Sequence, residues 1–115
     1  SYLLPQRVGL HQAKRMAFTG EIIGAAEAAE MGFVNAVVAP DAVAPTVDEL
    51  ATTIAAGPPL ALSMSKRMLD NAAHSSLAQA VEAEALAQNV NFGTTDTIEA
   101  MRAFAERRTP TFDGR

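Results

Sequence analysis

A chain of 115 residues is at most one domain with a modest core, and 49% hydrophobic with 19% charged residues is ordinary for a globular protein. The formal net charge of −4 argues against a nucleic-acid partner, because nucleic-acid-binding surfaces are basic. Cysteine is absent and only two histidines are present, which excludes a disulfide framework and argues against a metal site of thiolates or clustered histidines.

The first segment, SYLLPQRVG, does not have the pattern of a signal peptide. It lacks a basic stretch ahead of an apolar core, and Pro5 interrupts its hydrophobic residues. No later apolar run approaches the roughly 18–20 residues that a membrane span requires, so no membrane partner is predicted. Because the sequence starts with Ser1 and not with methionine, we expect residues 1–115 to be a fragment or processed product.

Apolar residues at helical spacing, together with helix-ending residues, predict about six helices. Two short helices come first, and each ends at a glycine that favours a left-handed conformation; they span residues 11–19 and 25–31. Four further helices are expected at about residues 41–56, 60–73, 76–92 and 96–108. The third of these should bury Leu77, Val81, Ala85 and Val90 at least partly, and residues 94–96, Thr-Thr-Asp, should cap the start of the last one. Ser76 and Gln79 have the spacing of a capping box, and Pro110 prevents continuation of the last helix.

The segment 33–38, with the sequence FVNAVV, is the only predicted strand. It is rich in β-branched residues and is bounded by Gly32 and Pro40. A strand needs a neighbour for its backbone N–H and C=O groups, so this one would pair with another copy or with sequence outside this chain. The predicted fold class is therefore mainly α, with about six helices and one short strand.

No segment carries a complete catalytic arrangement, a glycine-rich phosphate loop or a GxSxG nucleophile motif. His11 is expected on a solvated helix surface and His74 in a loop, each without the positioned partner that a general base needs. Glu82 and Glu84 are two residues apart, so they do not share a helix face. We therefore predict no catalytic residue and no metal ligand in this chain.

The C-terminal stretch EAMRAFAERRTPTFDG, residues 99–114, is the exception. Its helix carries Arg102, Arg107 and Arg108 around Phe104. Positive charge stabilises the C-terminal end of a helix, so these arginines can be helix caps only. Alternatively they form an anion site, because guanidinium groups bind phosphate and an aromatic ring can cover an adenine face. The residue pattern leaves both interpretations open.

Three stretches carry patterns that occur together, in this order, in one family. The most specific is residues 25–38, AAEAAEMGFVNAVV, which matches A-x-E-A-x-x-x-G-[LF]-V-N-x-V-V. Residues 4–20 contain Leu-Pro, Val-Gly and a terminal Ala-Phe-Thr-Gly, and residues 92–112 contain Phe-Gly-Thr-Thr-Asp and Ala-Phe-x-Glu-Arg-Arg-x-Pro-x-Phe. The chain thus resembles, over essentially its whole length, the C-terminal part of the crotonase superfamily, the enoyl-CoA hydratase/isomerase family.

This resemblance implies that residues 1–115 are the C-terminal helical and trimerisation region of a crotonase-like (ClpP/crotonase) α/β spiral fold. The N-terminal β-spiral core would lie outside this chain. Family hydratases add water to 2-trans-enoyl-CoA in fatty-acid β-oxidation, using two glutamates and an oxyanion hole of backbone N–H groups. Those glutamates and oxyanion-hole glycines match no position here, so the resemblance implies that this chain alone is inactive.

The resemblance also implies a ligand for the C-terminal stretch. By position, Phe104 would lie against the adenosine end of a neighbouring subunit's coenzyme A. Arg107 would lie near its phosphates, where the family commonly has lysine. Coenzyme A would be part of the acyl-CoA substrate and not a prosthetic group, and the assembly would be a homotrimer or hexamer. The expected location is the bacterial cytoplasm, or the mitochondrial matrix if the source is eukaryotic.

Two alternatives stay open from the sequence. In the first alternative, the chain is a non-catalytic helical oligomerisation module with charge-capped helices. It can also belong to a crotonase-family member with isomerase or hydrolase chemistry, because such members differ mainly at positions that this chain does not contain. Acyl-chain specificity depends on the same absent positions.

Overall fold

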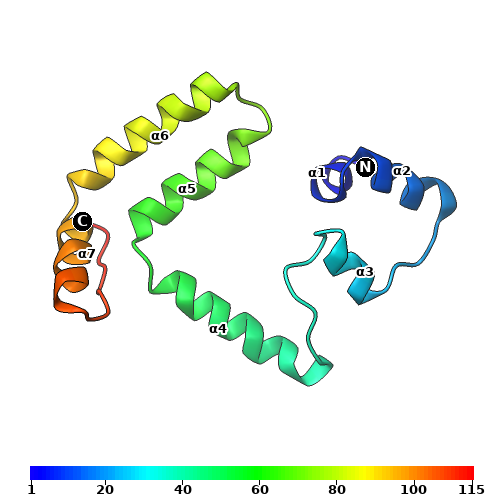
Figure 1. The fold of residues 1–115 in the computed structure, drawn as a ribbon, viewed down its shortest axis with the longest axis horizontal. Coiled ribbons are helices and arrows are strands. Elements are labelled where there is room, and N and C mark those ends of the chain that lie inside the picture. Colours follow the sequence, from blue (N-terminus) through cyan, green and yellow to red (C-terminus); the bar gives the residue numbers. More distant parts are fainter. The chain divides into compact units, whose positions relative to one another are not determined.

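The computed structural model describes residues 1–115 and contains seven α-helices and one 3-10 helix (Figure 1). The chain divides into two compact units, residues 1–46 and 47–115. The expectation of a mainly helical fold is confirmed. None of the helices combines the length and the hydropathy needed to cross a membrane.

The first unit begins with α1 (Leu3–Val8) and α2 (Leu10–Thr19), which pack against each other. Helix α1 was not predicted, because Pro5 was interpreted as a break. Pro5 instead occupies the third helical position, where a backbone N–H has no intrahelical partner and a proline costs little. Gly9, at φ 79°, joins the two helices in a conformation that favours glycine.

The end of α2 is fixed by one arginine. Arg15 Nε lies 2.6 Å from Glu21 Oε1, and Arg15 Nη2 lies 2.6 Å from Glu27 Oε1 in α3 (Ala25–Glu30). Gly20, at φ 64°, closes α2 in the left-handed conformation that the sequence predicted. These contacts hold the loop between α2 and α3 without any large buried side chain.

The predicted strand at residues 33–38 is wrong. This segment forms bends and irregular backbone that lead to the 3-10 helix η1 (Pro40–Ala42). The N–H of Phe33 donates to the C=O of Ala28 at 2.8 Å, as in a helix C-terminus and not in a sheet. The physical reason is that no second extended segment in the chain offers partner N–H and C=O groups.

Helix α4 (Val43–Ala55) begins at the border between the units, and the second unit continues with α5 (Pro59–Ala72), α6 (Leu77–Phe92) and α7 (Thr95–Glu106). Helices α5 and α6 run side by side in opposite directions (Figure 1). The predicted capping box is confirmed: Ser76 Oγ accepts from Gln79 N, and Gln79 Oε1 accepts from Ser76 N at 2.9 Å.

The buried face of α6 differs from the one predicted. In α6 the partly buried positions are Ala80, Ala83, Ala87 and Asn91. The residues predicted to be at least partly buried are all exposed, namely Leu77, Val81, Ala85 and Val90. The small side chains allow α5 and α6 to approach closely, which turns the larger residues outward. The prediction that this helix buries these four residues is therefore wrong within this chain.

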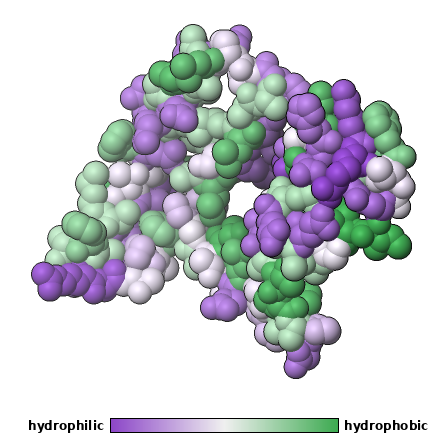
Figure 2. Space-filling model, turned by 45° about the vertical axis from the view of Figure 1, so that its right-hand side comes forward, coloured by the Kyte–Doolittle hydropathy of each residue, from purple (hydrophilic) through white to green (hydrophobic).

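Large apolar residues consequently lie on the surface along most of the second unit, and Figure 2 shows such apolar surface on one face of the molecule. The exposed stripe of α4 contains Val43, Val47, Leu50 and Ile54. The buried hydrophobic residues of the whole chain are only Ala13 and Ala103. Contiguous apolar surface of this kind is typical of a protein interface.

Candidate functional site

The C-terminal tail folds back along α7 and is bound at the start of that helix. The carboxylate of Asp96, which is 5% exposed, accepts from the backbone N–H of Asp113 at 2.9 Å and of Gly114 at 3.0 Å. Thr95 donates from its backbone N–H and its hydroxyl to the C=O of Arg115, at 2.6 and 2.7 Å. The first turn of α7 therefore holds the tail at residues 113–115.

The tail also packs against the first residue of α5. Gly114 has φ 81°, and a Cβ added there would lie 2.8 Å from Cγ of Pro59. Both the left-handed backbone and the close approach require glycine. The contact ties the end of the tail to α5 as well as to α7.

The opposite end of α7 closes with two backbone hydrogen bonds in the pattern of a Schellman motif. Arg108 N donates to Ala103 O at 3.0 Å, and Arg107 N donates to Phe104 O at 3.2 Å. Arg107 is the only non-glycine residue of the chain with positive φ, at φ 55° and ψ 40°. Glycine usually occupies this position, because a side chain in the left-handed region costs about 1–2 kcal/mol.

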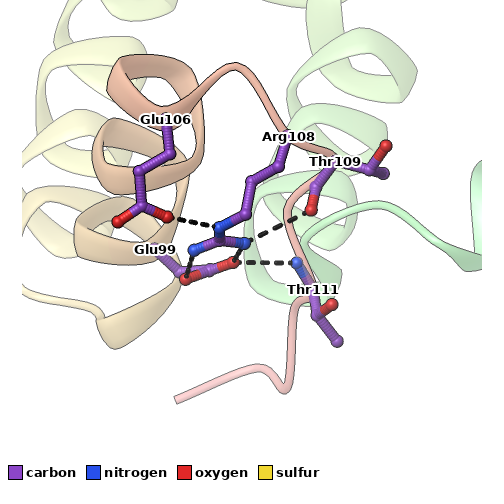
Figure 3. Close-up of polar contacts among 5 residues, drawn as sticks. All are labelled: Glu99, Glu106, Arg108, Thr109 and Thr111. Atoms are coloured by element: carbon purple, nitrogen blue, oxygen red, sulfur yellow. Dashed lines mark hydrogen bonds and ion pairs between the residues drawn. The ribbon is translucent and has the colours of Figure 1, made fainter.

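Arg108 forms an ion-pair network on the side of α7 (Figure 3). Its Nη1 and Nη2 donate to the two carboxylate oxygens of Glu99 at 2.5 and 2.8 Å, and its Nε donates to Glu106 Oε2 at 2.6 Å. Glu99 Oε1 also accepts from the backbone N–H of Thr111 at 3.2 Å. Two parallel guanidinium–carboxylate bonds are the strongest geometry for such a pair, so the network fixes the tail at residues 108–111.

This network changes the acid–base properties of its members. The hydrogen bond from Arg108, followed by that from the Thr111 N–H, lowers the pKa of Glu99 from 4.5 to about 2. The hydrogen bonds to Glu99 and then to Glu106 raise the pKa of Arg108 above its ordinary value. Glu99 is thus ionised throughout the physiological pH range.

The predicted site residues Phe104 and Arg107 lie together on the last turn of α7. The Phe104 side chain is 88% exposed, although it adjoins Ala103, which is only 1% exposed. Arg107 is exposed and its side chain takes no part in the ion pairs of this region. An exposed aromatic ring and an uncommitted guanidinium three positions apart in the sequence can together bind a ligand that combines a planar base with phosphate.

The three predicted arginines do not act alike. Arg108 is committed to Glu99 and Glu106, so it is not available to an outside anion. Arg102 is exposed and lies close enough to Glu99 to help lower its pKa. Arg102 and Arg107 are therefore the arginines of this cluster that stay outside its ion pairs.

Other parts of the chain offer no comparable site. A hollow of about 830 Å³ between α5 and α6 is lined by Met64, Met68, Arg67 and His74 among others. No three His, Asp or Glu side chains cluster in a way that could hold a metal ion. His11 lies exposed on α2.

Sequence reasoning missed the residues that hold the tail. Asp96 was interpreted only as part of a helix cap, and Glu99 was assigned no contact, yet both bind residues more than ten positions away. The only indication of these contacts in the sequence was Pro110 followed by a short polar tail. This pattern indicates that the helix ends before Pro110, but it does not indicate which residues of the helix the tail contacts. The partners became visible only in the structure.

Comparison with solved structures places the chain in the crotonase fold. An enoyl-CoA hydratase from Bacillus anthracis superposes on 97% of the chain with a TM-score of 0.92 and 33% identity, and the chain covers 43% of that structure. An enoyl-CoA hydratase from Mycobacterium tuberculosis superposes on 97% of the chain, and on 44% of its own length, with a TM-score of 0.88 and 31% identity. The helical arrangement is thus that of the corresponding part of these proteins.

The sequence profile of the family described as Enoyl-CoA hydratase/isomerase matches residues 1–115. The chain therefore belongs to the enoyl-CoA hydratase/isomerase family. It is 36% identical over 109 residues to a crotonyl-CoA hydratase of Syntrophomonas wolfei, and 35% identical over 105 residues to a short-chain-enoyl-CoA hydratase of Clostridium acetobutylicum. The two alignments include 95% and 91% of this chain, but only 42% and 40% of the respective relatives. The chain spans about two fifths of the length of these relatives.

Proposed function

We propose that the protein carrying this sequence is an enoyl-CoA hydratase that adds water to 2-trans-enoyl-CoA, as a step of fatty-acid β-oxidation. Support comes from the match over residues 1–115 and from relatives named crotonyl-CoA hydratase and short-chain-enoyl-CoA hydratase. This region would supply oligomer contacts and part of the coenzyme A site. The chemistry would belong to residues outside the chain, so residues 1–115 alone would be inactive.

The observation that carries the coenzyme A proposal is the last turn of α7. Phe104 is almost fully exposed, and Arg107 presents an exposed guanidinium next to it. In this proposal Phe104 covers the adenine face of an acyl-CoA bound at a neighbouring subunit. Arg107 binds a phosphate of the same molecule, in place of the lysine common in the family, which keeps the charge and adds the possibility of bidentate binding. Coenzyme A is needed only as part of the substrate.

The exposed apolar stripes support the proposal of an assembly. Leu50 and Ile54 of α4, and Val81 and Val90 of α6, are at least half exposed. Such surface is favourably buried against the rest of the protein and against other subunits. We expect a homotrimer or a hexamer, which sedimentation equilibrium would identify by mass. A monomeric mass at assay concentrations would contradict a site shared between subunits.

The compartment follows from the host organism in this proposal. The relatives include bacterial proteins as well as plant and human proteins whose names place them in mitochondria. We place the protein in the cytoplasm of a bacterial source or in the mitochondrial matrix of a eukaryotic one.

Product analysis tests the proposed reaction. The protein carrying this sequence is incubated with crotonyl-CoA, with a 3-enoyl-CoA and with a saturated acyl-CoA, and the isolated chain 1–115 serves as the negative control. A hydratase converts crotonyl-CoA to the 3-hydroxyacyl thioester. A shifted double bond or release of free coenzyme A without hydration would identify the isomerase or hydrolase alternative, and no turnover by either protein would favour a non-catalytic module.

A further inference from the structure

The ion-pair network that Arg108 forms at the side of α7 does not include Arg107. Arg107 lies between Glu106 and Arg108 in sequence, yet Glu106 is bound by Arg108 and not by its direct neighbour. Glu99, the other carboxylate on this side of the helix, is bound by Arg108 as well. Arg108 therefore occupies the nearby carboxylates that would otherwise compete for the Arg107 guanidinium.

The backbone at Arg107 gives a second, independent observation. Arg107 holds the left-handed conformation that glycine normally takes at the end of a helix. Strain of this kind persists only where the surroundings determine the conformation, and it is concentrated at functional sites. Here the surroundings are the N–H of Arg108 on Ala103 O, the Arg108 side chain on Glu99, and Thr111 N–H on the same carboxylate.

We propose that Glu99 and Arg108 are positioning residues for coenzyme A binding. Their ion pair holds the left-handed turn at Arg107 and keeps both carboxylates away from the Arg107 guanidinium, so that Arg107 and Phe104 are presented to the phosphate and adenine groups. The inference rests on the proposed function, because it needs Arg107 to contact the ligand. The low pKa of Glu99 supports it, since the pair stays fully charged at the pH of catalysis.

Steady-state kinetics with crotonyl-CoA, together with calorimetric binding of coenzyme A, test this in the whole protein. Arg107→Ala should raise KM about tenfold, the effect of losing one charge-assisted hydrogen bond. Glu99→Gln and Arg108→Lys should each raise KM about fivefold with kcat little changed, because they loosen a preformed site without touching the reacting atoms. The matched control is Asp70→Asn, which breaks the exposed Lys66–Asp70 ion pair on α5 and should leave KM unchanged.

A double-mutant cycle separates positioning from a direct or general structural role. If Glu99 acts through Arg107, Glu99→Gln adds no further increase of KM in the Arg107→Ala background. The exchange variant Glu99→Arg with Arg108→Glu should restore part of the affinity. Urea unfolding of every variant checks that the fold is retained, and Arg108→Lys serves if Glu99→Gln does not fold.

The outcomes also separate this inference from the proposed function. Unchanged KM in Arg107→Ala means that the proposed contact with coenzyme A is wrong. A raised KM in Arg107→Ala with unchanged KM in Glu99→Gln and Arg108→Lys overturns the positioning role alone. The positioning role is also overturned if Glu99→Gln raises KM as much in the Arg107→Ala background as it does in the unmodified protein. Equal losses of kcat and of affinity for coenzyme A in all variants overturn it as well.

Discussion

Asp96, in the first turn of α7, accepts a hydrogen bond from the backbone N–H of Gly114, eighteen positions later, at 3.0 Å. The same carboxylate accepts from the neighbouring Asp113 N–H, so a nearly buried acid holds the tail by two backbone groups. In the second turn of the helix Glu99 binds Arg108 and Thr111. The tail is thus attached to α7 at residues 108–111 and again at residues 113–114, and Arg107 ends the helix directly before the first attachment.

Replacing Asp96 by alanine should release the end of the tail. The part-buried hydrogen bonds to the backbone N–H groups of Asp113 and Gly114 would be lost, which we expect to lower the free energy of unfolding by about 1–3 kcal/mol. Urea denaturation measures this, and amide hydrogen exchange should accelerate at Asp113 and Gly114. Asp70→Ala, which removes only an exposed ion pair, should change the free energy of unfolding by less than about 1 kcal/mol. Equal effects of the two substitutions would contradict the role given to Asp96.

The pH dependence of stability should contain a contribution from Glu99. Its pKa is lowered in the folded chain, so its stabilising contribution is fully present above the ordinary pKa of 4.5. That contribution is lost as the pH falls from 4.5 through the folded value of about 2. Carboxyl NMR titration should give the low pKa, and Glu99→Gln should flatten the stability profile in this window. A titration near the ordinary value would show that the pair with Arg108 does not form in solution.

Arg107→Gly should separate stability from binding. Glycine relieves the left-handed strain, so we expect the free energy of unfolding to rise by about 1 kcal/mol. The same substitution removes the guanidinium and should weaken coenzyme A binding. Thermal unfolding and calorimetry measure the two effects side by side. If Arg107 were only a helix cap, the affinity for coenzyme A would be unchanged.

Gly114→Ala tests the packing of the tail on α5. The new Cβ would lie 2.8 Å from Pro59 Cγ, in a backbone conformation with φ 81°. We expect a loss of about 1–2 kcal/mol in the free energy of unfolding. Gly93→Ala is the matched control, because its added Cβ would lie 3.4 Å from Val90 O and its φ is −83°. A loss as large in the control would remove the special role of Gly114.

Local signals in the sequence predicted the helices well. The capping box at Ser76 and Gln79, the left-handed Gly20 and the helix start at Thr94 depend on neighbours within a few residues, and the structure confirms each. Signals that depend on distant partners failed. The strand at residues 33–38 was assigned from composition, but its backbone finds no partner strand in this chain.

Periodicity identified the apolar stripes but not what they face. The stripe through Leu77 and Val81 exists, yet the chain buries the alanine face of α6 because small residues let α5 come close. At the candidate site, the sequence indicated the charge cluster and the aromatic residue together. It could not show that Arg108 is committed to Glu99 and Glu106 while Arg107 is not, because that depends on the three-dimensional course of the tail.

The central proposal is that this region supplies the coenzyme A contact of an enoyl-CoA hydratase. The most direct measurement is the steady-state hydration of crotonyl-CoA by the whole protein and by its Arg107→Glu variant. We predict hydration by both proteins, with KM raised about tenfold or more in the variant and kcat little changed, because only a remote phosphate contact is lost. A fall in kcat at unchanged KM, or no hydration by the unmodified protein, would contradict the proposal.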